Sequence, residues 1–537
     1  MVALSPSTTR KCIMDKYFNV AGPCFPADHY MLPALDRMPE VRRLVGQKAY
    51  FVIHAPRQTG KTTAVQALAR EINATGERVA LYCSLETLQN ATDPARSADA
   101  IRGLLLFAAR NAFPEFFPDS DVTPCVRETD ATYAAETIAV REVLTSLCRR
   151  FKKPLVVFFD EADCLAGTVL ISFLRQLRDG YVNRNMVPFP ASIALVGMLD
   201  VRDYKAQIRP DGESLGQISP FNVITEDLML RNFTEAEVAA LYAQHTGATG
   251  QVFEQAALDK VWAFTRGQPW LVNALARECV VKIHGGDYTA PITADDIVAA
   301  KETIIRRRDT HVDSLMERLR EPRVRRVVEP VILGKDEFFS SDDPDCRLVL
   351  DLGLLREDEH HALVPGNAMY GEILLRYLSD AEQKRFYNLF REPFWAKPDG
   401  TLDMPALMRA FQAFWRENSG ADRVLYGFKE ATPHLVLAAF LQRVVNGGGR
   451  ITREMAIGRR RLDIGIEYGK GRYAVELKMK RQFGPDSLAQ LAGYLADLGL
   501  DEGWLAVFDD DPAKSWDEKI FLRDETCEGK TIHVVGL

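Results

Sequence analysis

The chain has 537 residues, of which 47% are hydrophobic and 26% are charged, and this composition predicts a soluble globular protein of roughly three or four domains. The formal net charge of −7 excludes a uniformly basic nucleic-acid-binding protein, so any contact with nucleic acid must come from local patches. Nine cysteines without a CxxC pair favour free thiols over disulfides or a zinc site. Without a signal-peptide pattern or an apolar run of membrane-spanning length, we expect a cytoplasmic protein that has no membrane partner.

A phosphate-binding loop is predicted between the strand-like residues 49–52 and a helix that begins at Thr63. The residues APRQTGKT (55–62) match the P-loop pattern G-x-x-x-x-G-K-[ST], except that Ala55 replaces the first glycine. In this pattern the backbone N–H groups curl around the phosphates, Lys61 reaches the β- and γ-oxygens, and the Thr62 hydroxyl binds Mg²⁺. The alternative is a strand-to-helix turn without a ligand. The predicted nucleotide contacts are Ala55, Arg57, Gln58, Thr59, Gly60, Lys61, Thr62 and Thr63.

An acidic strand end provides the second part of the predicted site. Residues Leu155–Phe159 are an unbroken apolar run, which is typical of a parallel strand buried on both faces, and Asp160 and Glu161 follow it. Asp160 is expected to hold Mg²⁺ through water, and Glu161 to polarise the attacking water. Alone, such a run is better explained as a strand-end acidic turn; together with the P-loop it indicates an ATPase.

Two further strands are expected in the same sheet. Residues Arg78–Leu85 predict an intervening strand between the two strands above, an arrangement that resembles the additional-strand class of P-loop ATPases. Residues Ser192–Asp200 predict the next strand. AAA-type ATPases place a γ-phosphate sensor where that strand ends, so Asp200 or Arg202 is a candidate sensor; the alternative is a solvated loop residue.

Residues 17–308 resemble the prokaryotic AAA-like ATPases that are related to STAND and archaeal-type ATPases. The resemblance lies in YFVIHAPRQTGKTT, LVVFFDEADCL, FLRQLRDGYVNR with VGMLDVRDYK, SPFNV and TRGQPWLVNALA. It implies a helical lid after the sheet and a G-x-P turn near the nucleotide, which Gly267-Gln268-Pro269 matches, so Pro269 is a candidate contact. It also implies that residues 21–33 wrap the adenine, which makes His29 and Tyr30 candidates; ordinary packing is the alternative for both.

The middle of the chain combines a basic segment with helical patterns. Residues Arg306–Val328 are basic, and helical spacing places much of that charge on one face, which fits either a solvated helix or a nucleic-acid contact. Residues Cys346–Leu378 predict a helix, a hairpin through Glu357–Ala362 and another helix, which resembles a winged-helix unit. Such units also pack between domains without reading DNA.

A β-hairpin is predicted near the C-terminus. Residues 462–467 and 472–478 alternate like strands on either side of YGKG. A two-residue type II′ turn that begins with Gly469 makes Tyr468 oppose Gly471. Counting along this register makes Asp463 oppose Glu476. Because the side-chain period is two, Lys478 lies on the same face.

Two opposed carboxylates repel each other unless a cation lies between them, and Mg²⁺ prefers such oxygen ligands. Asp463 and Glu476 are therefore the candidate metal ligands, and Lys478 can orient or activate water. The pattern D-x12-E-x-K resembles the PD-(D/E)xK nuclease superfamily; a charged edge hairpin is the alternative. Gln490 and Tyr494, four residues apart on the following helix, match the superfamily's helical motif.

One departure from that superfamily concerns the acidic residue that many active members carry in the helix before the first strand. Here Gln442 is the polar residue of that helix, and Glu430 lies further upstream. Arg450, Arg453 and residues 459–461 lie where a phosphate backbone is expected to approach, although a salt-bridged surface explains these arginines equally well.

The predicted fold class is α/β: a P-loop NTPase parallel sheet with a helical lid, a winged-helix and helical connector, and a C-terminal restriction-endonuclease-like domain. The predicted segments are 1–48 (adenine side), 49–230 (AAA-like core), 231–308 (lid), 309–380 (winged-helix-like), 381–429 (connector) and 430–537 (nuclease-like).

The predicted function is ATP-regulated, Mg²⁺-dependent cleavage of nucleic acid, with DNA as the expected polymer and catalysis by Glu161, Asp463, Glu476, Lys478 and Gln490. ATP and Mg²⁺ are the expected cofactors, and a homo-oligomer is a candidate assembly. Resemblance alone adds defence against foreign DNA. The main alternative is a STAND-type signalling switch whose nuclease-like domain binds but does not cut; a chaperone-like or transcription-regulating ATPase is a third interpretation.

Overall fold

The structure is a computed structural model that describes residues 16–117, 138–198, 223–307, 309–332, 343–359, 361–378, 395–425, 437, 440–441, 449–457, 460–509, 511 and 513–537. The chain divides into two compact units, Met1–Arg325 with Phe339–Tyr370 and Arg326–Phe338 with Gly371–Leu537. Within the described ranges all cysteines are free, and no helix is both long and apolar enough to cross a bilayer.

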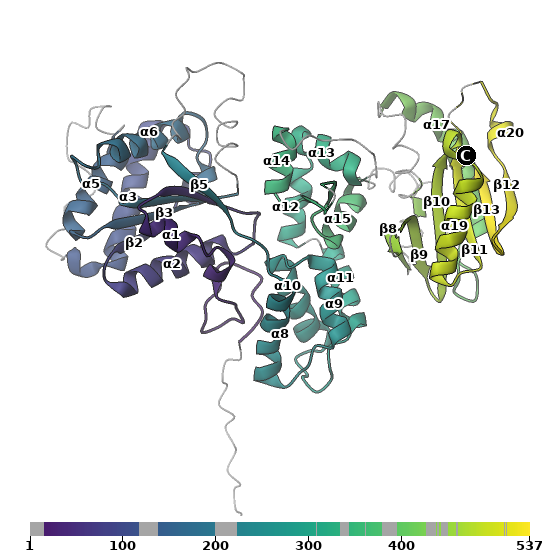
Figure 1. The fold of residues 1–537 in the computed structure, drawn as a ribbon, viewed down its shortest axis with the longest axis horizontal. Coiled ribbons are helices and arrows are strands. Elements are labelled where there is room, and N and C mark those ends of the chain that lie inside the picture. Colours follow the sequence, from purple (N-terminus) through teal and green to yellow (C-terminus); the bar gives the residue numbers. More distant parts are fainter. Residues whose placement is uncertain are drawn as a thin grey trace, which may run out of the picture. The chain divides into compact units, whose positions relative to one another are not determined.

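A five-stranded sheet forms the centre of the first unit (Figure 1). Its strands are β1 (Tyr50–His54), β2 (Val79–Ser84), β3 (Leu155–Asp160), β4 (Ser192–Gly197) and β5 (Ile224–Met229). They lie in the order β2-β3-β4-β1-β5, and every neighbouring pair is parallel. β1, β3 and β4 are buried along their whole length, which explains their unbroken apolar sequences. The predicted α/β parallel sheet is therefore confirmed.

The strand predicted between the P-loop strand and the acidic strand lies elsewhere in the sheet. Along the chain β2 comes between β1 and β3, but in the sheet β4 separates those two strands and β2 forms the edge. Chain order does not fix sheet order, because a crossover connection can pass over more than one strand. The ends of β1, β4 and β3 are therefore neighbours, which brings the P-loop close to Asp160.

Helices cover both faces of this sheet (Figure 1). On one face α3 (Pro94–Ala112), α5 (Ala139–Phe151) and α6 (Gly167–Asn183) share a core with Val52 and Val157. On the other face η1 (Ala34–Arg37), α1 (Val41–Gly46) and α2 (Lys61–Thr75) share a core with Phe51 and Phe158. Successive strand residues point to opposite faces, so one apolar run supplies both cores.

A helical region follows β5. It contains α8 (Glu235–Thr249), α9 (Gln255–Thr265), α10 (Pro269–Arg277) and α11 (Ala294–Arg307). We call it the lid, as in the resemblance. A capping box begins α8: the Thr234 hydroxyl accepts from the Glu237 N–H at 3.2 Å, and the Glu237 carboxylate accepts from the Thr234 N–H at 2.8 Å.

The elements after the lid have the predicted helix, hairpin and helix order. They are α12 (Thr310–Arg318), α13 (Pro322–Ile332), α14 (Pro344–Asp351), the antiparallel pair β6 (Leu355–Glu357) and β7 (Leu363–Pro365), and α15 (Ala368–Leu378). The part of these elements that lies in the first unit comprises the described residues of 309–325 and 343–370. We call it the post-lid region. Two of the unit boundaries fall within α13 and α15.

His311 joins the lid to the post-lid region. Its ring stacks on Trp270 of α10 with centroids 4.7 Å apart, and its Nε2 lies 2.7 Å from the hydroxyl of Tyr370. Only 2% of His311 is exposed, and burial lowers its pKa to about 3. The folded protein therefore keeps this imidazole neutral.

This buried histidine predicts a pH-dependent stability. Between pH 6.5 and 3 the unfolded chain binds a proton on His311 that the folded chain does not, so stability falls as pH falls, by up to about 1.4 kcal/mol per pH unit. We expect His311→Phe, which keeps a ring in the stack, to flatten this slope in denaturant unfolding between pH 7 and pH 5.5. His361→Gln is the control, because 88% of the His361 side chain is exposed. Equal slopes for wild type and His311→Phe contradict the prediction.

The second unit contains a six-stranded mixed sheet in the order β12-β13-β11-β10-β9-β8. The strands are β8 (Gly449–Ile457), β9 (Arg460–Tyr468), β10 (Gly471–Met479), β11 (Glu502–Phe508), β12 (Leu522–Cys527) and β13 (Lys530–Gly536). On one face α17 (Met404–Leu425) packs against Val475 and Trp504; on the other α19 (Pro485–Leu498) packs against Ala474 and Leu505. The helix predicted as part of a connector thus shares a core with the six-stranded sheet.

The predicted hairpin register is confirmed over the five pairs from Gly471↔Tyr468 to Val475↔Ile464. Gly469 has φ 55°, and a Cβ on it would lie 2.1 Å from the carbonyl oxygen of Gly400. Glycine at the first turn position is therefore required twice, by the left-handed backbone and by the close approach.

Candidate nucleotide and metal sites

The P-loop connects β1 to α2 through two residues with positive φ, Gln58 at 59° and Gly60 at 91°. Non-glycine residues rarely adopt such values, and at functional sites they hold a loop in a special shape. Because α2 begins at Lys61, its free N–H groups and its positive dipole end open toward the inside of the loop. This is an anion-binding geometry.

Lys61 is 7% exposed and folds back on its own loop. Its ammonium donates to the carbonyl oxygens of Ala55 at 2.8 Å and Pro56 at 3.0 Å. Burial lowers the pKa of Lys61, and the carboxylates of Glu161, Asp163 and Asp160 oppose this shift. The loop carbonyls therefore hold the ammonium where phosphate oxygens can replace them.

Asp160, at the end of β3, contacts both the P-loop and β2. It is 1% exposed, and its Oδ2 accepts from the Thr62 hydroxyl at 2.7 Å and from the Tyr82 hydroxyl at 2.9 Å. A carboxylate and a hydroxyl in contact form an oxygen donor set of the kind that Mg²⁺ prefers. Thr62 and Asp160, predicted as metal ligands from separate motifs, thus meet in the structure.

Glu161 follows Asp160 in a left-handed conformation, with φ 55°. Burial, and then the neighbouring Asp163, raise the pKa of Glu161. A carboxylate with a raised pKa is a better proton acceptor than an ordinary one, which suits the predicted role with water. The strained backbone is consistent with a position held for function.

A cavity of about 880 Å³ joins these groups. The P-loop residues 57–63, Asp160 and Glu161 line it, and so do Tyr30, Pro269 and Trp270. Tyr30 and Pro269 thus line the same cavity as the P-loop, and their contact with a nucleotide stays a prediction.

His29 and Ala55 are not among the residues that line this cavity. His29 is buried, its Nδ1 accepts from the Phe25 N–H at 2.8 Å, and its ring contacts Tyr17 edge-on. Ordinary packing accounts for it. Ala55 reaches the site indirectly, through the carbonyl that accepts from Lys61.

Each residue of the G-x-P turn has a structural role. Gly267 has φ 73°, and a Cβ on it would lie 1.9 Å from the carbonyl oxygen of Phe233, so only glycine fits. Gln268 caps α10 by accepting from the Leu271 N–H at 2.6 Å, and Pro269 is the first helical residue. The turn thus fixes where α10 meets the cavity.

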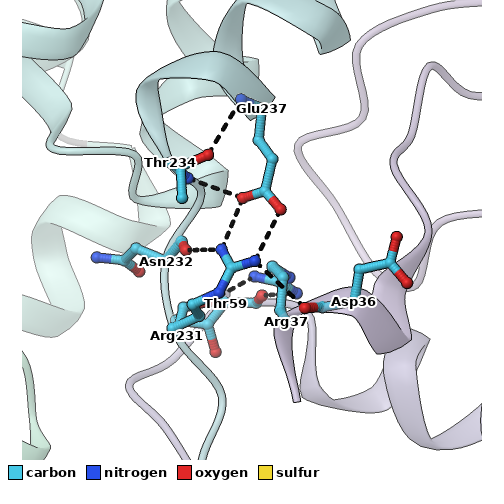
Figure 2. A network of polar contacts seen from close by, with 7 residues as sticks. All are labelled: Asp36, Arg37, Thr59, Arg231, Asn232, Thr234 and Glu237. Carbon is cyan, nitrogen blue, oxygen red and sulfur yellow. Dashed lines mark hydrogen bonds and ion pairs between the residues drawn. The ribbon is translucent and has the colours of Figure 1, made fainter. Parts of the chain in front are cut away.

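Arg37 is a part of the site that the sequence motifs do not reveal (Figure 2). Its guanidinium donates to the carbonyl of Thr59 in the P-loop at 2.7 Å and to the carbonyl of Arg231 at 3.1 Å, and it lies over the Phe233 ring. Burial lowers its pKa to about 10, so it remains charged at neutral pH. Arg37 therefore ties the P-loop to the connection between β5 and the lid.

Arg231 extends this network to α8. It forms a two-bond pair with Glu237, at 2.7 and 2.8 Å, and donates to the Asp36 carbonyl at 3.3 Å (Figure 2). The pairing with Arg231 is the main cause that lowers the pKa of Glu237 to about 2, and the capping-box bonds with Thr234 lower it further. The T-x-x-E sequence at 234–237 indicates the cap, but nothing local in the sequence indicates Arg37.

The second candidate site lies on the hairpin of the second unit. The Oε1 of Glu476 accepts from the Lys478 ammonium at 2.9 Å and from the Gln490 amide at 3.1 Å. The Oδ2 of Asp463 accepts from the Leu477 N–H at 2.8 Å, and the Asp463 N–H donates to Oε2 of Glu476 at 3.3 Å. The four residues named from the sequence are thus brought together.

Electrostatics at this second site are unfavourable for two carboxylates. Glu476 is 1% exposed, and burial, followed by the charge of Asp463, raises its pKa. Gln490 is oriented by a second bond, to the Tyr494 hydroxyl at 2.8 Å. Among the described residues, no group of three or more His, Cys, Asp and Glu side chains is placed to hold a metal, so a cation here would rest on two carboxylates with water or phosphate.

Several predicted residues cannot be compared with the structure. Asp200, Arg202, Glu430 and Gln442 lie outside the described residues. In the basic segment, by contrast, four of the described arginines are engaged in ion pairs, which favours a solvated helix face over a nucleic-acid contact. These pairs are Arg306–Glu302, Arg307–Glu278, Arg318–Glu321 and Arg323–Asp345.

No protein-family model matches the chain, and no curated protein sequence does. Among solved structures it is similar to a Walker-type ATPase of Pyrococcus abyssi, with 13% identity and a TM-score of 0.47 over 66% of this chain and 99% of that one. It is also similar to RuvB, the Holliday junction branch migration motor of Thermotoga maritima (15% identity, TM-score 0.33, 62% of this chain and 95% of that one). A third similar structure is Cdc6p of Pyrobaculum aerophilum, with 11% identity and a TM-score of 0.34 over 65% of this chain and 95% of that one. At identities and TM-scores this low, no activity is carried over to this chain.

Proposed function

We propose that the chain is an ATP-regulated, Mg²⁺-dependent nuclease that cuts DNA. The observation that carries the nuclease proposal is the meeting of Asp463, Glu476, Lys478 and Gln490 at one buried carboxylate. These residues come from β9, β10 and α19, so three elements converge on one point. A charged surface hairpin would leave its side chains in solvent, whereas Glu476 is 1% exposed.

ATP binding is proposed for the cavity of the first unit. The loop N–H groups and Lys61 would bind the phosphates, and Thr62 and Asp160 would hold a Mg²⁺ ion that neutralises phosphate charge. Glu161 accepts the proton of the attacking water, which its raised pKa favours. Tyr30 and Pro269 lie at the part of the cavity that we assign to the adenine.

For cleavage, Asp463 and Glu476 are the residues that hold Mg²⁺. A bound Mg²⁺ would supply a water of lowered pKa and stabilise charge on the phosphate. Lys478 steadies the developing negative charge, and Gln490 keeps the Glu476 carboxylate oriented through its own bond to Tyr494. Burial is the main cause that raises the pKa of Glu476, and a bound cation would offset the second cause, the repulsion from Asp463.

The purified chain, incubated with plasmid DNA, single-stranded DNA and RNA, tests this proposal. We expect DNA cleavage that requires Mg²⁺ and stops when a chelator is added. The cleavage rate should differ among the ATP-bound, ADP-bound and nucleotide-free forms, because a nucleotide regulates cleavage only if the protein's conformation differs between these forms. Sedimentation of the same three forms tests for a homo-oligomer.

A signalling switch that binds without cutting is the second candidate. It is favoured by the absence of a third carboxylate from the cluster within the described residues. ATP hydrolysis and ATP-dependent assembly without cleavage of any polymer would select this function instead.

A further inference from the structure

Arg318, the last residue of α12, reaches the nucleotide cavity from beyond the lid. It lines that cavity, its side chain is 31% exposed, and its Nη2 lies 4.0 Å from the sulfur of Met198. Met198 follows β4, and the carbonyl of the preceding Gly197 accepts from the Ala55 N–H at 3.3 Å. The Arg318 guanidinium is therefore at the P-loop side of the cavity, where phosphates are expected.

The post-lid region also contacts the P-loop directly. A Cβ on Gly353 would lie 2.6 Å from the ring of Pro56, so backbone and loop are in close contact there. In addition, Nδ1 of His54, at the end of β1, lies 3.8 Å from the Asp351 carboxylate. The approach of Arg318 is thus one of several contacts that this region makes around the loop.

The present partner of Arg318 is weak and replaceable. Its Nη1 lies 2.6 Å from Oε1 of Glu321, whose side chain is 43% exposed. Exposed pairs of this kind contribute little to stability, because water solvates both charges well. A guanidinium matches two phosphate oxygens in shape and charge, so a phosphate can replace Glu321 after a side-chain rotation.

We propose that Arg318 binds the γ-phosphate of ATP within the same chain and so distinguishes ATP from ADP; this rests on the proposed ATP binding. The N–H groups of a P-loop enclose the α- and β-phosphates and Lys61 reaches the β- and γ-oxygens, which leaves the outer oxygens of the γ-phosphate to groups outside the loop. α13 begins at Pro322, and the second unit begins at residue 326. A change at Arg318 therefore acts on the segment that leads into the second unit.

Nucleotide affinities of Arg318→Ala test this assignment. Binding of a non-hydrolysable ATP analogue and of ADP, each with Mg²⁺, is measured by calorimetry on the full chain. We expect the variant to lose about ten- to a hundredfold in affinity for the analogue and to keep its affinity for ADP, because a charge-assisted bond to one phosphate is removed. Arg318→Gln, which keeps a polar side chain that can donate a hydrogen bond but not the charge, is expected to show the same loss.

Arg320→Ala is the matched control, since Arg320 is exposed, lies two residues further on and is not among the residues lining the cavity. It should bind both nucleotides as wild type does. Equal losses for both nucleotides in the Arg318 variants, or no loss, would overturn the role of Arg318 and leave ATP binding intact. Failure of the wild type to bind either nucleotide would instead overturn the proposed function.

Discussion

Replacing Asp463 with alanine is expected to abolish Mg²⁺-dependent DNA cleavage while ATP hydrolysis continues at the wild-type rate. Loss of one of two carboxylate ligands removes the ion, which contributes several kcal/mol to transition-state stabilisation, so cleavage should fall by about a thousandfold or more. Glu476→Ala should have the same effect. ATP hydrolysis should survive, because its residues belong to the other unit.

Lys478→Ala separates metal binding from catalysis at the same site. It should keep the affinity for Mg²⁺, measured by calorimetry, and lose cleavage by about a hundredfold or more, because the charge that steadies the transition state is gone. Glu467→Ala is a control for the Asp463 variant: it removes an exposed carboxylate four residues along the same strand. If Asp463→Ala cuts DNA undiminished, the hairpin is not a catalytic site and the signalling switch is the better description.

Lys61→Ala and Glu161→Gln should impair the ATPase in two different ways. Lys61→Ala removes the ammonium that contacts phosphate, so ATP affinity and hydrolysis should both fall. Glu161→Gln keeps the shape of the site but accepts no proton; it should bind ATP normally and hydrolyse it about 10²- to 10⁴-fold more slowly. Calorimetry and phosphate release measure the two quantities separately.

Glu77→Gln, at an exposed position that does not line the cavity, is the control for these variants. Thermal unfolding of Lys61→Ala is needed as well, since Lys61 holds two carbonyls of its own loop. Unimpaired ATP turnover in both variants would contradict the assignment of the cavity.

Short-range patterns in the sequence determine several features of this protein. The P-loop, its strand and its helix are encoded in consecutive residues, and the acidic strand end is encoded in another short run. The register of β9 and β10 can be counted from the sequence, because a two-residue turn that begins with Gly469 leaves a single pairing. That register alone places Asp463, Glu476 and Lys478 on one face of the hairpin.

Contacts between distant residues were decided only by the tertiary structure. Arg37 binds the Thr59 carbonyl, Tyr82 binds Asp160, and Arg318 approaches Met198, across 22, 78 and 120 positions. No local spacing indicates such pairs, because they depend on which strands become neighbours: β4, not β2, lies between β1 and β3. The place of α17 was decided in the same way, since an apolar helix face shows that it will be buried but not which sheet will cover it.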